Sequence, residues 1–177
     1  MSGNISIRFV TEDDPLSAMI RVQSGICVPF TPSHAEAVSQ DGKFYIGQHL
    51  SGGMLARPVG YDSAKLMKLP DGTMSEKVVA LLCTDEQEAA FYAYINGKIG
   101  QPYDWKSILS FIDPAWNLHD FNHLICSAIM TAGLRSKGCE YFPMPLVVPY
   151  HHISPRDLFL ILSSHVQIDH AGEFSNG

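Results

Sequence analysis

The stretch His123–Leu134, HLICSAIMTAGL, places a single cysteine at the start of a small and apolar run. Apolar residues recur at helical spacing behind Cys126, and Asp120 and Asn122 just upstream are N-cap candidates. The pattern predicts a helix that holds Cys126 in its first turn or two. The positive end of a helix dipole favours the thiolate, which is the nucleophilic form. The alternative is a cysteine that serves as a small core side chain, since free cysteine is often buried.

Composition indicates one globular domain. The chain has 177 residues, of which 46% are hydrophobic and 17% are charged, and this is enough for one well-filled core. We assign residues 1–165 to the domain and 166–177 to a polar, frayed tail. A formal charge of -6 without basic runs argues against a nucleic-acid or anionic-membrane partner. Neither a signal-peptide pattern nor an apolar run of ~18 residues is present, which predicts a cytoplasmic protein.

The cysteines are even in number but scattered. Cys27, Cys83, Cys126 and Cys139 show no CxxC spacing, and a chain of this size does not need disulfides for stability. We therefore expect reduced thiols, with a structural role for all of them except Cys126.

Alternating side chains and turn signals predict an antiparallel sheet. Asp41-Gly42 is a strong signal for a two-residue hairpin turn, and Gly52-Gly53 marks a second turn. The apolar run KVVALLC, residues 77–83, is typical of a buried strand. The predicted strands cover residues 5–10, 33–39, 43–48, 54–59 and 77–83.

Capping signals predict three further helices. A capping residue precedes each, and a proline follows the cap in the first and the last. They run from Pro15 to about Gln23, from Thr84 to Gly97 or Gly100, and from Arg156 to Leu162. The sequence therefore predicts an α+β fold with a central antiparallel sheet flanked by helices.

His34 is the best-placed base for Cys126. Strand alternation puts His34, Glu36 and Val38 on one face, and the predicted hairpin brings Gln48 and His49 across from His34. A cysteine nucleophile needs a histidine and a third group that fixes the ring, whatever their order in the chain. The alternative is a half-buried strand histidine whose hydrogen bonds are satisfied by a neighbour.

Five short segments carry a family resemblance. They are IRFVTEDDPLSAMIR (Ile7–Arg21), SHAEAV (Ser33–Val38), GQPYDW (Gly100–Trp105), CSAIMTAGL (Cys126–Leu134) and SPRDL (Ser154–Leu158). Together they resemble the circularly permuted papain-like cysteine hydrolases, the YiiX-like relatives of the NlpC cell-wall endopeptidases. The histidine strand comes first and the cysteine helix last, as in that family. The resemblance implies a permuted papain-like, NlpC-like fold.

The resemblance also implies site roles. It makes Cys126 the nucleophile and His34 the general base and later the general acid, with Tyr103 lining the cleft. Glu36 matches the acidic position two residues after the histidine in phage-like members. Its side chain is expected to run along the face of His34, however, whereas Gln48 or His49 on the paired strand is better placed for an orienting hydrogen bond.

The implied mechanism is acyl transfer through a thioester, without a metal or cofactor. Backbone N–H groups at the head of the cysteine helix, including that of Cys126, would stabilise the oxyanion. The substrate would be a small-molecule, peptide or lipid-like acyl compound, since all of these present a carbonyl to the thiolate. A different hypothesis is a binding or structural module, for example of a phage particle, that keeps the fold with weak or no turnover.

A zinc site is the less favoured chemistry. His119, His123 and Cys126 fall at i, i+4 and i+7, so an earlier helix start would place them on one face with Cys139 as a fourth ligand. A helix that begins near Cys126 leaves His119 outside it. His151-His152 is read as part of a loop.

Overall fold

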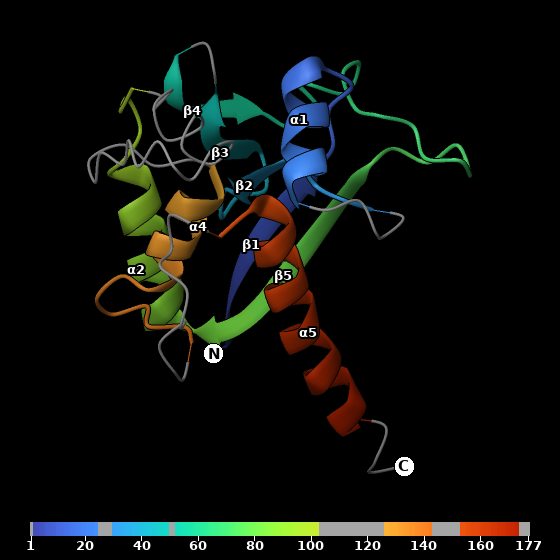
Figure 1. Cartoon of the computed structure of the whole chain (residues 1–177). Coiled ribbons are helices and arrows are strands. Elements are labelled where there is room, and N and C mark those ends of the chain that lie inside the picture. Colours follow the sequence, from blue (N-terminus) through green and yellow to red (C-terminus); the bar gives the residue numbers. More distant parts are fainter. Residues whose placement is uncertain (1, 25–29, 50–51, 103–125, 143–152, 174–177) are drawn as a thin grey trace.

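Five antiparallel strands form one sheet in the computed structural model, in the order β4-β3-β2-β1-β5 (Figure 1). The structure describes residues 2–24, 30–49, 52–102, 126–142 and 153–173, with side chains omitted at residues 2, 23–24 and 165–173. Every pair of neighbouring strands is antiparallel. The strands are β1 (Ser2–Val10), β2 (His34–Val38), β3 (Phe44–His49), β4 (Gly53–Pro58) and β5 (Glu76–Thr84).

Helices cover one face of this sheet. Ile5, Ile7 and Phe9 of β1, the strand between β2 and β5, are fully buried on that face and share one core with apolar side chains of α2, α4 and α5. The odd-numbered residues of β1 thus face the helices, as the alternation of ISIRFV predicts. The described helices are α1 (Pro15–Ser24), α2 (Asp85–Asn96), α4 (Cys126–Leu134) and α5 (Pro155–Glu173).

The first hairpin keeps the predicted register but has a wider loop. β2 and β3 pair Ala37 with Ile46 and Val38 with Tyr45, the register that a two-residue Asp41-Gly42 turn would give. The Ser39 N–H donates to the Phe44 carbonyl, so residues 40–43 form a four-residue loop instead. The Asp41 carboxylate accepts from the Ser39 hydroxyl and the Lys43 N–H, which stabilises the wider loop.

β5 corrects the expectation of a buried strand at residues 77–83. Among the described strands it pairs with β1 alone and forms an edge of the sheet. Val79 and Leu81 face the core, whereas Val78 and Leu82 are 53% and 64% exposed. A continuous apolar run does not separate a two-sided buried strand from an edge strand with one open face.

The predicted caps are present. Asp14 Oδ1 accepts from the N–H groups of Leu16 and Ser17 at the start of α1. Thr84 forms a capping box with Gln87 at the start of α2, and Gly97 ends this helix.

The last helix, α5, is longer than predicted. Ser154 Oγ accepts from the Asp157 N–H at its start, in agreement with the cap predicted there. The backbone remains helical to Glu173, beyond the predicted end at Leu162 and through most of the segment expected to be a frayed tail. No proline or glycine interrupts residues 156–171, so no local signal stops the helix. The division into a 1–165 domain and a tail stays a prediction.

Fold class and thiol state follow from the described residues. The molecule is α+β, and Cys83, Cys126 and Cys139 are free thiols. Among the described helices none is both long and apolar enough to cross a membrane. Several predicted features lie outside the described residues. These are Cys27, Tyr103, His119, Asp120, Asn122, His123, His151 and His152.

Candidate functional site

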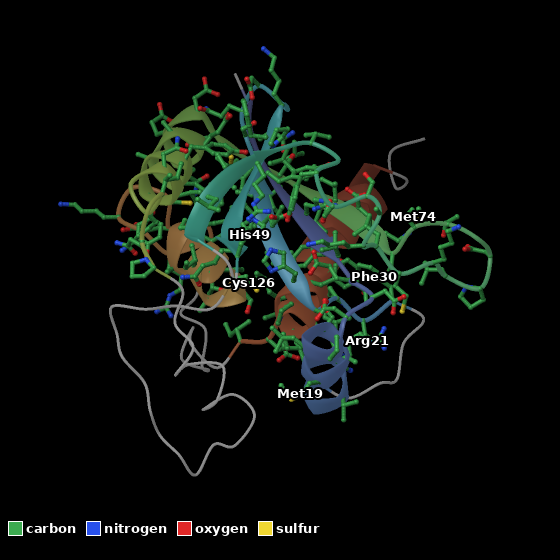
Figure 2. All side chains as sticks on the ribbon, turned by 90° about the horizontal axis from the view of Figure 1, so that it is seen from above. Met19, Arg21, Phe30, His49, Met74 and Cys126 are labelled. Carbon is green, nitrogen blue, oxygen red and sulfur yellow. The ribbon has the colours of Figure 1, made fainter. Side chains whose placement is uncertain are left out.

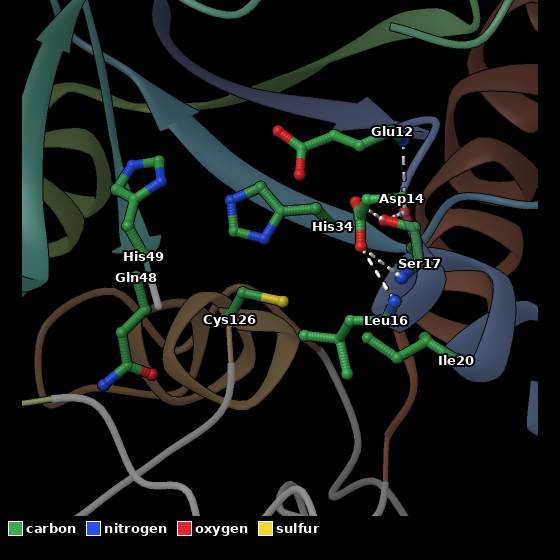
Figure 3. Close-up of a pocket in the computed structure, with 10 residues that line it drawn as sticks. Glu12, Asp14, Leu16, Ser17, Ile20, His34, Gln48, His49 and Cys126 are labelled. Carbon is green, nitrogen blue, oxygen red and sulfur yellow. Dashed lines mark hydrogen bonds between the residues drawn. The ribbon is translucent and has the colours of Figure 1, made fainter. Parts of the chain in front are cut away.

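The candidate site lies at one end of the sheet, where antiparallel order brings three strand ends together. β2 begins at His34, β3 ends at His49, and Glu12 follows the last residues of β1. Cys126 is the first residue of α4 and approaches this end from the helical face, close to His49 in the view of Figure 2. One pocket is lined by Glu12, Asp14, Leu16, Ser17, Ile20, Ser33, His34, Gln48, His49 and Cys126 (Figure 3).

Cys126 and His34 form a buried acid–base pair. Burial disfavours the Cys126 thiolate, but the charge of His34 and a hydrogen bond with it outweigh burial, and the pKa of the thiol is lowered. Backbone hydrogen bonds from Ala35 and Ser127 to the sulfur lower this pKa further. Burial likewise disfavours the His34 imidazolium, yet Cys126 and Glu36 together raise the pKa of His34 well above its usual value. Each group therefore stabilises the charged form of the other, the thiolate of Cys126 and the imidazolium of His34.

Glu36 is the carboxylate behind His34. Its Oε1 lies 3.5 Å from His34 Nε2, so Nδ1 is the ring nitrogen on the thiol side in Figure 3. Burial would raise the pKa of Glu36, but contacts with His34 and His49 hold it well below its usual value. This placement corrects the expectation that the paired strand supplies the orienting group. A glutamate side chain is long enough to reach a ring two residues earlier on the same strand face.

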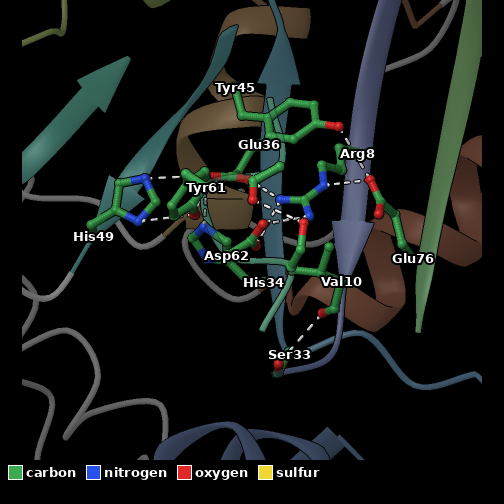
Figure 4. A network of polar contacts seen from close by, with 12 residues as sticks. Arg8, Val10, Ser33, His34, Glu36, Tyr45, His49, Tyr61, Asp62 and Glu76 are labelled. Carbon is green, nitrogen blue, oxygen red and sulfur yellow. Dashed lines mark hydrogen bonds and ion pairs between the residues drawn. The ribbon is translucent and has the colours of Figure 1, made fainter. Parts of the chain in front are cut away.

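A buried arginine fixes the other oxygen of Glu36. Arg8 Nη1 donates to Glu36 Oε2 at 2.7 Å, and both side chains are almost fully buried (Figure 4). The same guanidinium bonds both carboxylate oxygens of Asp62 at 2.9 Å and donates from Nε to Glu76. Its Cζ lies 4.1 Å from the centre of the Tyr45 ring. Arg8 thus holds Glu36 in one orientation.

His49 and Tyr61 also contact Glu36 Oε1. His49 Nε2 lies 3.1 Å from this oxygen, and the Tyr61 hydroxyl donates to it at 3.0 Å. The two imidazole contacts have ion-pair distances but lack the N–H alignment of a hydrogen bond. Burial lowers the pKa of His49, and it raises that of Tyr61. His34 and His49 therefore both lie against the same oxygen of Glu36, and the centres of their rings are 5.5 Å apart.

Gln48 points to the other side of the sheet from Glu36. Its Nε2 donates to the Pro102 carbonyl at 3.2 Å, whereas its buried Oε1 has no hydrogen-bond partner in the described part of the chain. Gln48 lines the pocket without orienting His34. Tyr103, the other predicted cleft residue, is not among the described residues.

Three residues that shape the site were not predicted from the sequence. A Cβ at Gly47 would lie 2.6 Å from Glu36 Cγ, so only glycine leaves room for this carboxylate on the paired strand. Arg8 carried a signal, as the one charged residue within the strand ISIRFV. Asp62 lies in a polar loop without any pattern that marks it as a buried ion-pair partner.

One cluster of described residues has the donor set of a metal site. Single ligand atoms of His34, Glu36 and His49 lie within 4.8 Å of one another. Two imidazoles and a carboxylate form a donor set that suits zinc. Two members of the predicted zinc set, His119 and His123, lie outside the described residues. Its Cys139 is a buried core thiol with a pKa raised by burial to about 11.

Comparison with known proteins shows a distant structural similarity. No family model and no curated protein matches the chain. Among solved structures, the metalloprotein yiiX from Escherichia coli O157:H7 is similar to it, with 17% sequence identity and a TM-score of 0.48. The similarity covers 73% of this chain and 63% of that one, so the chain spans less than two thirds of its neighbour's length. Similarity at this level carries no information about chemistry.

Proposed function

We propose that this chain is a cysteine hydrolase of the peptidase or amidase type, on a permuted papain-like fold. The observation that carries the proposal is the Cys126–His34–Glu36 arrangement in one pocket, with the pKa of the thiol lowered and that of the imidazole raised. A cysteine in the core alone would have its thiol pKa raised by burial, as Cys139 does. Nucleophilic catalysis requires a lowered thiol pKa, and the pKa of Cys126 is lowered.

Each group has one task in the proposed mechanism. The Cys126 thiolate attacks the carbonyl carbon of an acyl substrate, and the collapse of the tetrahedral intermediate breaks the bond to the leaving group, which takes the His34 proton. Water then attacks the thioester and loses its proton to His34. The carboxylic acid is released, and the Cys126 thiolate and the His34 imidazolium are restored. Glu36 keeps His34 oriented and charged, and backbone N–H groups at the start of α4 stabilise the oxyanion.

Acylation by an activated ester tests this function. A 4-nitrophenyl ester of a short carboxylic acid should release one rapid equivalent of nitrophenol and leave the acyl group on Cys126, located by mass spectrometry. Cys126→Ser and His34→Ala should each abolish the burst, whereas Cys83→Ser should retain it. Equal pH profiles of Cys126 alkylation in the wild-type protein and His34→Ala would contradict the hydrolase and favour a binding or structural module.

The His34–Glu36–His49 cluster supports a second candidate, a zinc protein. Its ligand atoms already converge, and the Nε2 atoms of both histidines are buried without a well-aligned hydrogen bond. Calorimetric titration with Zn²⁺ separates the two candidates through His49→Ala, which removes a metal ligand but no member of the Cys126–His34–Glu36 set. Zinc binding that is lost in His49→Ala, with no burst in the metal-free wild-type protein, would favour the metal site. A burst that persists in chelator would favour the hydrolase.

A further inference from the structure

The pocket beside Cys126 contains a carboxylate that the proposed mechanism does not use. Glu12 lines the pocket and is half-buried there, and its charge interacts with His34. Its carboxylate has no hydrogen bond or salt bridge within the described residues. Figure 3 shows it above the imidazole, on the side of the pocket opposite the thiol.

The neighbouring carboxylate has a structural role instead. Asp14 Oδ1 accepts from the N–H groups of Leu16 and Ser17, and its Oδ2 accepts from the Ser17 hydroxyl. These bonds cap α1 and satisfy the carboxylate. Glu12 is therefore the acidic side chain of the pocket that is left for a ligand.

A second hydrogen-bond acceptor faces the same pocket. Gln48 is 2% exposed, and its Oε1 is buried without a partner in the described part of the chain. Because Nε2 donates to the Pro102 carbonyl, the amide orientation is fixed and the free atom is the acceptor. A buried acceptor left unpaired is costly, and a bound N–H donor would remove that cost.

We propose that the site acts on acyl substrates that carry a protonated amine near the reacting carbonyl, with the ammonium bound by Glu12 and a substrate N–H bound by Gln48. This inference rests on the proposed hydrolase function and adds the class of substrate. Leu16 and Ile20 of α1 supply an apolar wall for the aliphatic carbons between the amine and the carbonyl. Anionic acyl groups would be repelled by the Glu12 charge, and purely lipid-like ones would make no polar contact with it.

Charge-matched thiol reagents test the proposal without a known substrate. Aminoethyl, hydroxyethyl and sulfonatoethyl methanethiosulfonates have the same leaving group, methanesulfinate, and the Cys126 thiolate displaces it to form a mixed disulfide. We expect the wild-type protein to react faster with the cation than with the anion. Glu12→Gln should lower this cation-to-anion ratio about 5- to 10-fold, the effect of removing one unit charge from a partly solvated pocket.

The ratio separates the binding role of Glu12 from its effect on the thiolate. Glu12→Gln also lowers the pKa of His34 and so slows all three reagents, but this change cancels in the ratio. Asp13→Asn is the matched control, since Asp13 is exposed, does not line the pocket and carries the same charge. In the wild-type protein, added salt should lower the ratio, which provides a measurement that needs no variant.

The outcomes distinguish the two levels of the proposal. Fast, His34-dependent reaction with equal ratios in the wild-type protein and Glu12→Gln would overturn the ammonium site and leave the hydrolase standing. Slow reaction with every reagent, unchanged by His34→Ala, would overturn the hydrolase itself. A ratio that falls in Glu12→Gln and is kept in Asp13→Asn supports the substrate class.

Discussion

Arg8 and Glu36 form a buried ion pair, with Arg8 Nη1 2.7 Å from Glu36 Oε2 and side chains 1% and 0% exposed. The pair links β1 to its neighbour β2, the central strand of the sheet, which begins with His34. A buried pair of this kind contributes less to stability than its distance suggests, because both charges lose their hydration. Its clearer effect is on the site, since it fixes the carboxylate that faces His34.

Removing the guanidinium should destabilise the fold strongly. Arg8→Met removes the cation that pairs with the buried carboxylates of Glu36 and Asp62, and we expect the free energy of unfolding to fall by about 3–5 kcal/mol. Urea denaturation measures this change. Lys43→Met removes an exposed pair with Asp41, whose atoms are 3.8 Å apart, and should leave the free energy of unfolding almost unchanged. Equal losses in the two variants would contradict the role of Arg8.

Neutralising Glu36 should shift the reactivity of Cys126 to higher pH. The carboxylate favours the His34 imidazolium, so Glu36→Gln lowers the pKa of His34 and weakens the positive charge that favours the thiolate. The pKa of Cys126 therefore rises. We expect the midpoint of the alkylation rate against pH to move up by about one unit. Glu88→Gln, which changes the same charge on α2, should leave the midpoint unchanged, and a midpoint unaffected by Glu36→Gln would exclude the carboxylate from the site.

The coupling of Cys126 and His34 should also appear at the histidine. The thiolate raises the pKa of His34, so Cys126→Ser should lower it, because a serine hydroxyl stays neutral at the same pH. Titration of the imidazole signals by NMR measures the shift. In Cys83→Ser, where the half-buried thiol lies outside the pocket, the His34 titration should match that of the wild-type protein. No shift in Cys126→Ser would show that the two groups titrate independently.

Gly47 should affect stability and reactivity together. An added Cβ would lie 2.6 Å from Glu36 Cγ, so Gly47→Ala must displace the carboxylate or the strand. We expect the free energy of unfolding to fall by about 1–3 kcal/mol and the pH midpoint of Cys126 alkylation to move upward. Gly42→Ala strains the hairpin loop at φ +70 with no atom within 4 Å of the new Cβ. It should therefore lower stability without moving the midpoint, and a midpoint that moves equally in both variants would refute a specific effect on Glu36.

Local patterns in the sequence predicted much of the fold. The caps at Asp14, Thr84 and Ser154 depend on side chains that bond backbone groups two or three residues away, so the sequence alone specifies them. The register of the first hairpin also follows from local spacing, and it brought His34 and His49 together. The helix that places Cys126 at its start was recognisable from its apolar spacing.

The third member of the site required the tertiary structure. Strand alternation placed Glu36 on the face of His34, but only the bond from Arg8 and the space left by Gly47 determine that its carboxylate turns to the imidazole. The free Glu12 carboxylate likewise depends on Asp14 being engaged at a helix cap. Periodicity and capping are set by neighbours in the chain, and the sequence determines them. Which buried charges pair is set by groups far apart in the chain, and this only the packing of the strands decides.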